Sequence, residues 1–178
     1  MLGTSKEIKN PGLNILPPGV ERHVVNGGAL TAFQIFPDDE LEIINNEGNQ
    51  ICEIICFNKD GKSDAGILNL KTNNDKNFIR SILNGKDETI LATNHQLKKR
   101  NLNISESKSS IIFDLDTKAG ESFKLKSKDK CYAIFAAPSE DMDVTNQNPP
   151  SDLTIFIKRS QIVNDKELNV IPDPVFEP

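Results

Sequence analysis

Residues that carry enzymatic chemistry are scarce in this chain of 178 residues, which has no tryptophan, one tyrosine and two histidines. With Tyr132 as the only large polar aromatic residue, a platform on which bases or sugars could stack is poorly supported. Only His23 and His95 are available to a mechanism that depends on an imidazole. The sequence contains no Gly-x-Ser-x-Gly elbow, glycine-rich phosphate loop, His-Glu-x-x-His pair or Cys-x-x-Cys motif. The sequence therefore declares no activity by itself.

Cysteines and long apolar runs are also few. The three cysteines are an odd number, and the sequence opens with no segment that resembles a secretion leader. We therefore expect no disulfide bonds and a cytoplasmic, reducing setting. No apolar run approaches the roughly 20 residues that a membrane-spanning helix needs, so we expect no membrane partner.

Acidic residues outnumber basic ones, so the net charge is -5 and the sequence pI is near 5.1. A protein that binds nucleic acid normally presents a basic face, so we expect no nucleic-acid partner. The basic cluster Leu97–Arg100 is short, and we interpret it as a solvated turn.

Short β-type runs separated by turn residues make up most of what is present. The runs 20–25 and 29–36 flank an Asn-Gly turn, which is the strongest local signal for a β-hairpin. The alternating run 41–46 and the nearly continuous apolar run 50–58 follow, with polar turns between them. We expect these four runs to form a β-meander.

The middle of the chain has a helical pattern. Phe78, Ile79, Ile82 and Leu83 form one apolar stripe, Asn74 or Asp75 precedes it as a candidate cap, and Gly85 follows it. We predict one short helix here. The stretch 88–104 is compatible with a further helix or with one strand around residues 89–92, because periodicity does not separate the two for a short apolar run.

Further β-type runs complete the pattern, and they lie at 109–117, 121–126, 131–138 and 153–158. Together with the earlier runs they predict a mainly β fold, an antiparallel barrel or sandwich built from hairpins with one or two short helices. Residues 38–57 and 120–137 share a layout of acidic turn, strand, polar turn and strand with an early cysteine, a weak indication of an internal repeat. We expect a flexible segment at 1–14, a β-rich domain at 15–160 and a proline-rich linker at 161–178.

The cysteines are better core residues than ligands or nucleophiles. On a strand, Cys52 and Cys56 would lie roughly 13 Å apart, too far for a disulfide or for one zinc ion without a bend. With Ile54 they would occupy one face of the strand, and small thiols pack well in cores. Cys131 begins another strand and receives the same interpretation.

The remaining candidates for chemistry favour structural roles. Alternation places His23 beside Glu21 on one strand face, at a surface or rim position, and His95 lies in a polar stretch that indicates a loop or helix surface. The carboxylates of Asp38–Glu40 and of Asp114 with Asp116 stand beside turns and are expected to be solvated. We therefore assign no catalytic, cofactor-binding or metal-binding residue.

Three segments resemble a known family. Residues 16–64, from "LPPGVERHVV" to "KDGKSD", resemble the opening of the urea-carboxylase-associated family of β-rich domains. Residues 141–160, with "NPPSDLTIFIK", and the closing "IPDPVFEP" resemble the point at which such a module ends in long bacterial proteins that are similar to the aminomethyltransferase of glycine cleavage, the T protein. There a linker leads to a further module and then to a folate-type transferase domain.

The resemblance implies a function for the chain and for its surroundings. The chain would be the N-terminal piece of such a fusion, a non-catalytic accessory or interaction domain whose partners are the other domains of the same polypeptide. It would hold no cofactor, and tetrahydrofolate would bind to the missing transferase domain. The second half lacks the histidine- and cysteine-rich signatures of the enzymatic family members, so no catalytic residue transfers. Two alternatives stay open, a hydrolase of small urea- or guanidine-type compounds with a cysteine or carboxylate near His23 or His95, and a barrel that binds an unknown small molecule.

Overall fold

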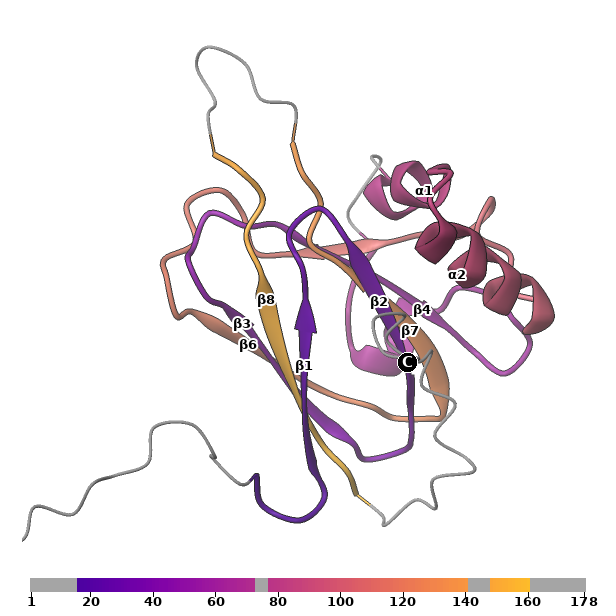
Figure 1. The fold of residues 1–178 in the computed structure, drawn as a ribbon. Helices are drawn as coiled ribbons and strands as arrows, with labels where there is room; N and C mark the ends of the chain where they lie inside the picture. Colours follow the sequence, from indigo (N-terminus) through magenta and orange to yellow (C-terminus); the bar gives the residue numbers. More distant parts are fainter. Residues whose placement is uncertain (1–15, 73–76, 141–147, 161–178) are drawn as a thin grey trace, which may run out of the picture.

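The computed structural model describes residues 16–72, 77–140 and 148–160, which fold into two four-stranded antiparallel sheets packed face to face (Figure 1). The strands are β1 Val20–Val25, β2 Leu30–Ile35, β3 Glu40–Asn45, β4 Cys52–Phe57, β5 Ser110–Ile112, β6 Ser122–Lys126, β7 Cys131–Ala136 and β8 Leu153–Lys158. One sheet has the order β1-β8-β3-β6 and the other β2-β7-β4-β5. The predicted mainly β fold is confirmed, in the form of a sandwich.

The strand order is that of a jelly roll. β1 pairs along its full length with β8, and β2 pairs along its full length with β7. Each short connection therefore carries the chain from one sheet to the other. The fold is held by pairings between segments that are far apart in the sequence.

The predicted hairpin around the Asn-Gly turn is wrong, although both of its strands are present. β1 and β2 lie in different sheets, and the turn is a corner between the sheets. Gly28 supplies a positive φ of 80° there and donates a backbone hydrogen bond to Ala137. A positive φ serves a corner as well as a hairpin, so the turn residues alone do not choose between them. The expected β-meander is not formed either, because β1 and β3 lie in one sheet and β2 and β4 in the other.

The two segments that resemble each other lie strand against strand. Residues 38–57 contain β3 and β4, and residues 120–137 contain β6 and β7. β3 pairs with β6, and β4 pairs with β7, so each strand of one segment meets its counterpart in the other. Duplication of this unit stays a prediction.

The helical part lies against the outer face of the β2-β7-β4-β5 sheet (Figure 1). α1 spans Phe78–Leu83 and α2 spans Glu88–Lys99, and a short 3-10 helix, η1, spans Ala65–Leu68. The side chain of Asp87 caps α2 by accepting a hydrogen bond of 2.9 Å from the Ile90 amide. Of the two structures compatible with the stretch 88–104, a helix or a strand, the protein therefore forms the helix.

The cap of α1 differs from the prediction. Asn77 caps this helix, with its side chain accepting a hydrogen bond from the Arg80 amide at 2.9 Å. Asn74 and Asp75, the predicted caps, lie outside the described residues, as do the predicted flexible segment 1–14 and linker 161–178.

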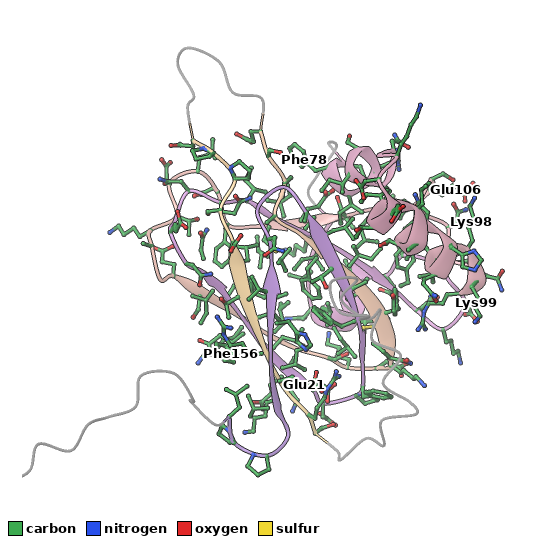
Figure 2. All side chains as sticks on the ribbon, in the orientation of Figure 1. Glu21, Phe78, Lys98, Lys99, Glu106 and Phe156 are labelled. Atoms are coloured by element: carbon green, nitrogen blue, oxygen red, sulfur yellow. The ribbon has the colours of Figure 1, made fainter. Side chains whose placement is uncertain are left out.

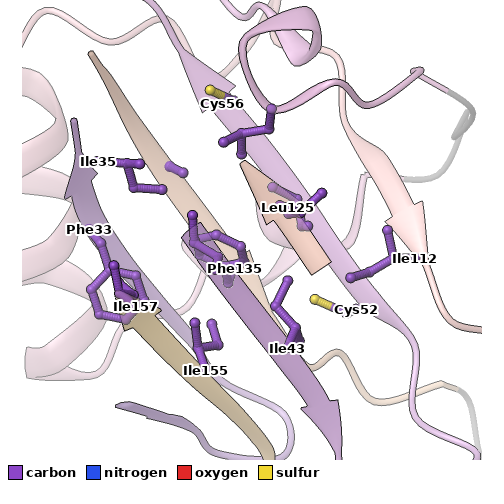
Figure 3. Packing of buried hydrophobic residues seen from close by; sticks show 14 of the residues in the cluster. Phe33, Ile35, Ile43, Cys52, Cys56, Ile112, Leu125, Phe135, Ile155 and Ile157 are labelled. Carbon is purple, nitrogen blue, oxygen red and sulfur yellow. The ribbon is translucent and has the colours of Figure 1, made fainter. Parts of the chain in front are cut away.

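Two apolar cores hold the layers together. The cluster between the sheets consists of aliphatic, aromatic and cysteine side chains, and Figure 3 shows residues such as Phe33, Phe135 and Ile155 meeting there. A second cluster, with Phe57, Ile79 and Leu97, packs the helices onto the outer face of the sheet. Full burial of each such side chain contributes about 1.5–3 kcal/mol. The space between the sheets is therefore an apolar core.

Helices within the described ranges are short. The longest, α2, has 12 residues, and no helix in these ranges is long and apolar enough to cross a membrane.

Candidate functional site

A cluster of charged side chains lies at the edge of the sandwich where β1 and β2 stand next to each other. The guanidinium of Arg159, whose side chain is 5% exposed, is at its centre. Its Nε and Nη2 atoms donate hydrogen bonds to the two carboxylate oxygens of Glu21, at 2.8 and 3.0 Å. Its Nη1 atom donates to the Asp39 carboxylate at 2.7 Å and to the Gln34 carbonyl at 2.9 Å. Arg159 thus links both sheets.

Asp39 is completely buried, which corrects its interpretation as a solvated turn residue. Besides the bond from Arg159, its carboxylate accepts hydrogen bonds from the backbone amides of Phe36 and Ser160, each at 2.9 Å. Burial of a carboxylate is tolerated because these donors and a counter-charge compensate for lost water. Its neighbours Asp38 and Glu40 are exposed, as expected.

Glu21 also contacts His23, so the predicted placement of these two side chains on one strand face is confirmed. The His23 Nε2 atom lies 3.0 Å from Glu21 Oε2, and the imidazole packs on the Phe33 ring at 4.3 Å between centroids. Burial by itself would raise the pKa of the Glu21 carboxyl, but hydrogen bonds from His23 and Arg159 outweigh burial and lower this pKa to about 2. At neutral pH an ionised carboxylate therefore holds the imidazole, which is 22% exposed and sits at the rim (Figure 2 labels Glu21 on β1).

This arrangement can do two things. Its ion pairs hold the two sheets together at this edge of the sandwich. It also presents an oriented imidazole that can transfer a proton. Arg159 was missed by sequence reasoning because its partners lie 120 and 138 residues away. Its only local signal is a cation that directly follows the last strand.

The cysteines are core residues, as predicted. Cys52, Ile54 and Cys56 belong to the cluster between the sheets, and all three cysteines of the chain are buried and unbridged (Figure 3 labels Cys52 and Cys56). Burial raises the pKa of the Cys52 thiol, and a hydrogen bond to Cys131 followed by burial raises the pKa of the Cys56 thiol. Because the thiolate is the nucleophile, neither Cys52 nor Cys56 is suited to attack a substrate.

His95 and the second carboxylate pair have surface positions. His95 is exposed on α2, on the helical side of the molecule. Asp114 accepts hydrogen bonds from the Asp116 amide and the Thr117 hydroxyl, at 2.9 and 3.1 Å, so it shapes a turn. Within the described parts of the chain, His, Cys, Asp and Glu nowhere gather in a group of three or more that could hold a metal ion.

Comparison with known proteins adds one relative. No protein-family model matches the chain. The trimethylamine-oxide aldolase of Ruegeria pomeroyi is 30% identical over 171 residues, which are 96% of this chain and 22% of that protein. The chain thus spans about a fifth of the length of the curated relative that it matches.

This similarity overturns the expectation of a non-catalytic accessory domain in an aminomethyltransferase-like protein. The relative is named as an enzyme, and the alignment extends over nearly the whole chain. The resemblance to the urea-carboxylase-associated family, the partner domains and the tetrahydrofolate site that it implies stay predictions, because neither the fold nor the relative tests them.

Proposed function

We propose that this chain belongs to an enzyme that cleaves a small amine oxide in the manner of an aldolase, with trimethylamine oxide as the first substrate to test. The 30% identity to trimethylamine-oxide aldolase along 96% of the chain supports this function. Because the aligned region makes up 22% of the relative, we propose the activity for the natural protein that contains these residues.

The proposed cleavage balances without another reactant. Trimethylamine oxide has the atoms of one formaldehyde and one dimethylamine. The nitrogen–oxygen bond and one nitrogen–carbon bond break, while that methyl carbon becomes bonded to oxygen. The carbon is oxidised and the nitrogen is reduced, so no external oxidant or reductant is consumed. A proton must leave the methyl group and another must reach the nitrogen, so the reaction calls for a group that moves protons.

Among the described residues, we propose the imidazole of His23 as that group. Glu21 fixes its orientation at 3.0 Å, and its position at the rim leaves it partly accessible. The cysteines Cys52 and Cys56 are poor candidates because their thiols are buried and their pKa values are raised.

The function is tested by measuring aldehyde release by the natural protein. Purified protein is incubated with trimethylamine oxide, and formaldehyde is measured over time. Trimethylamine, which lacks the oxygen, is the matched control, and urea and guanidine test the hydrolase alternative through ammonia release. We expect formaldehyde from trimethylamine oxide alone. Ammonia from urea or guanidine, with no formaldehyde from the amine oxide, would reverse the assignment.

The role of His23 is tested separately. We expect His23→Gln to lower kcat by about 10²-fold or more, the usual contribution of a positioned acid or base. His95→Gln, which changes the other imidazole of the chain, is expected to keep kcat. Glutamine can still donate to Glu21, so the thermal unfolding midpoint of His23→Gln should stay within a few degrees. An unchanged kcat in His23→Gln would confine His23 to sealing the sheet edge.

We also propose the cytoplasm as the setting of this enzyme. The absence of any bridge among the three cysteines supports a reducing compartment.

A further inference from the structure

A groove of about 620 Å³ lies on the helical side of the molecule, between α1, α2 and residues 104–105. The described residues that line it include none of the charged cluster of Arg159. Figure 2 labels Lys98 on this outer side. The proposed proton-transfer chemistry does not use this groove.

The charged residues that line the groove in the described part of the chain are basic. Arg80 from α1 and Lys98 from α2 line it together with His95, and the described residues that line it include no carboxylate. The chain as a whole has a net charge of -5, so a purely basic lining is not a consequence of overall composition. Such a lining attracts anions.

The groove also has an apolar side. Leu83 and Ile104 contribute apolar surface, and Leu91 is the most exposed large hydrophobic residue of the described chain, at 56%. Leu91, His95 and Lys98 follow one another at helical spacings of four and three residues, so they share one face of α2. An apolar side chain and two polar ones are thus presented side by side.

Hydrogen bonds hold the walls in place. Arg80 Nη2 donates to the Ser105 carbonyl at 2.8 Å, which fixes the loop against α1. Asn94 Nδ2 donates to the Leu83 carbonyl at 2.7 Å, which ties α2 to the end of α1. The groove thus has fixed walls and combines apolar surface with polar and charged groups, two elements that small-molecule sites use for binding and for orientation.

We propose that this groove binds a small organic anion, with an apolar body against Leu91 and a phosphate or carboxylate head near Arg80 and Lys98. The inference does not rest on the proposed aldolase activity. Trimethylamine oxide carries no net charge and has no need of a basic lining, so this groove would be a second site for a different ligand.

The test is a titration of the ¹⁵N-labelled chain followed by NMR. The probes are phenyl phosphate, benzoate and benzyl alcohol, which share an aromatic body and differ in the head. We expect saturable shifts in amides of residues 80–84, 91–98 and 104–105 with at least one anion, and binding of benzyl alcohol at least tenfold weaker. Whichever of phenyl phosphate and benzoate binds more tightly shows whether the groove prefers a phosphate or a carboxylate head.

Matched variants complete the test. Lys98→Gln removes a charge from the groove, whereas Lys99→Gln removes one from the next residue of α2, which does not line it. We expect Lys98→Gln to weaken binding about twofold to fivefold, as for an exposed ion pair, and Lys99→Gln to leave it unchanged. Equal binding of the alcohol and the anions, equal effects of the two variants, or shifts spread over distant basic residues would each overturn the proposal.

Discussion

Arg159 and Asp39 form an ion pair of 2.7 Å in which the Asp39 side chain is fully buried and the Arg159 side chain is 5% exposed. The pair joins the residue that follows β8 to the turn between β2 and β3. Arg159 also donates to the Gln34 carbonyl on β2, in the other sheet, so the pair lies where the two sheets are joined and where Glu21 holds His23.

Removing the buried charge should be costly. We expect Asp39→Asn to lower the free energy of unfolding by about 3 kcal/mol, because it leaves Arg159 without one of its compensating charges in a buried place. Asp38→Asn is the matched control, since the Asp38 side chain is 71% exposed in its pair with Lys126. Asparagine also accepts its positive φ of 66°. Urea denaturation should place the control within about 0.5 kcal/mol of the parent; similar losses in both variants would contradict the buried-pair account.

Glu21 should make stability depend on pH in the acid range. Its pKa in the folded protein is about 2, below the ordinary value of 4.5. Its stabilising effect is therefore complete above pH 4.5 and is lost as the pH falls toward 2. Allowing for solvent screening of a partly exposed group, we expect a loss of about 1–2 kcal/mol. Urea denaturation of the parent and of Glu21→Gln between pH 6 and pH 2 should show a shallower acid decline in the variant; parallel curves would mean that Glu21 is not held as described.

The thiols should be unreactive in the folded state. Cys52, Cys56 and Cys131 are each at most 3% exposed, and reaction with iodoacetamide needs an accessible thiolate. We expect intact mass after treatment at pH 8 to show no adduct on native protein and three in urea, matching the three cysteines. Rapid labelling of a native thiol would instead reopen a role for cysteine in catalysis.

Two glycines with positive φ should differ in their tolerance of alanine. Gly61 has φ +77°, and an added Cβ would overlap the carbonyl oxygen of Asn101, whereas Gly120 has φ +82° with no atom within 4 Å of that position. We expect Gly120→Ala to cost about 1 kcal/mol from backbone strain alone. Gly61→Ala should cost at least about 1 kcal/mol more, because the loop after α2 must move. Chemical denaturation measures both, and equal costs would show that the loop yields freely.

Local sequence patterns predict which segments form strands better than they predict which strands pair with each other. The apolar runs of β4 and β7 and the alternation of β3 identify strands because burial decides which residues they contain. At the Gly28 corner the sequence pattern predicts a hairpin, because the same turn residues suit both a hairpin and a corner. Only the pairing of β1 with β8, set by residues more than a hundred positions apart, separates the two.

The candidate site shows the same limit. Glu21 and His23 are two residues apart on one strand, so alternation placed them together correctly. The burial of Asp39 depends on Arg159, and nothing near either residue in the sequence reveals the other. Turn chemistry alone therefore predicted an exposed carboxylate.

The most direct test of the proposed function is the product ratio from trimethylamine oxide, measured by ¹H NMR with the natural protein under anaerobic conditions. Aldolase-type cleavage predicts formaldehyde and dimethylamine in equal amounts, with no added oxidant or reductant. Unchanged trimethylamine oxide, or its conversion to trimethylamine only in the presence of a reductant, would contradict the proposed function.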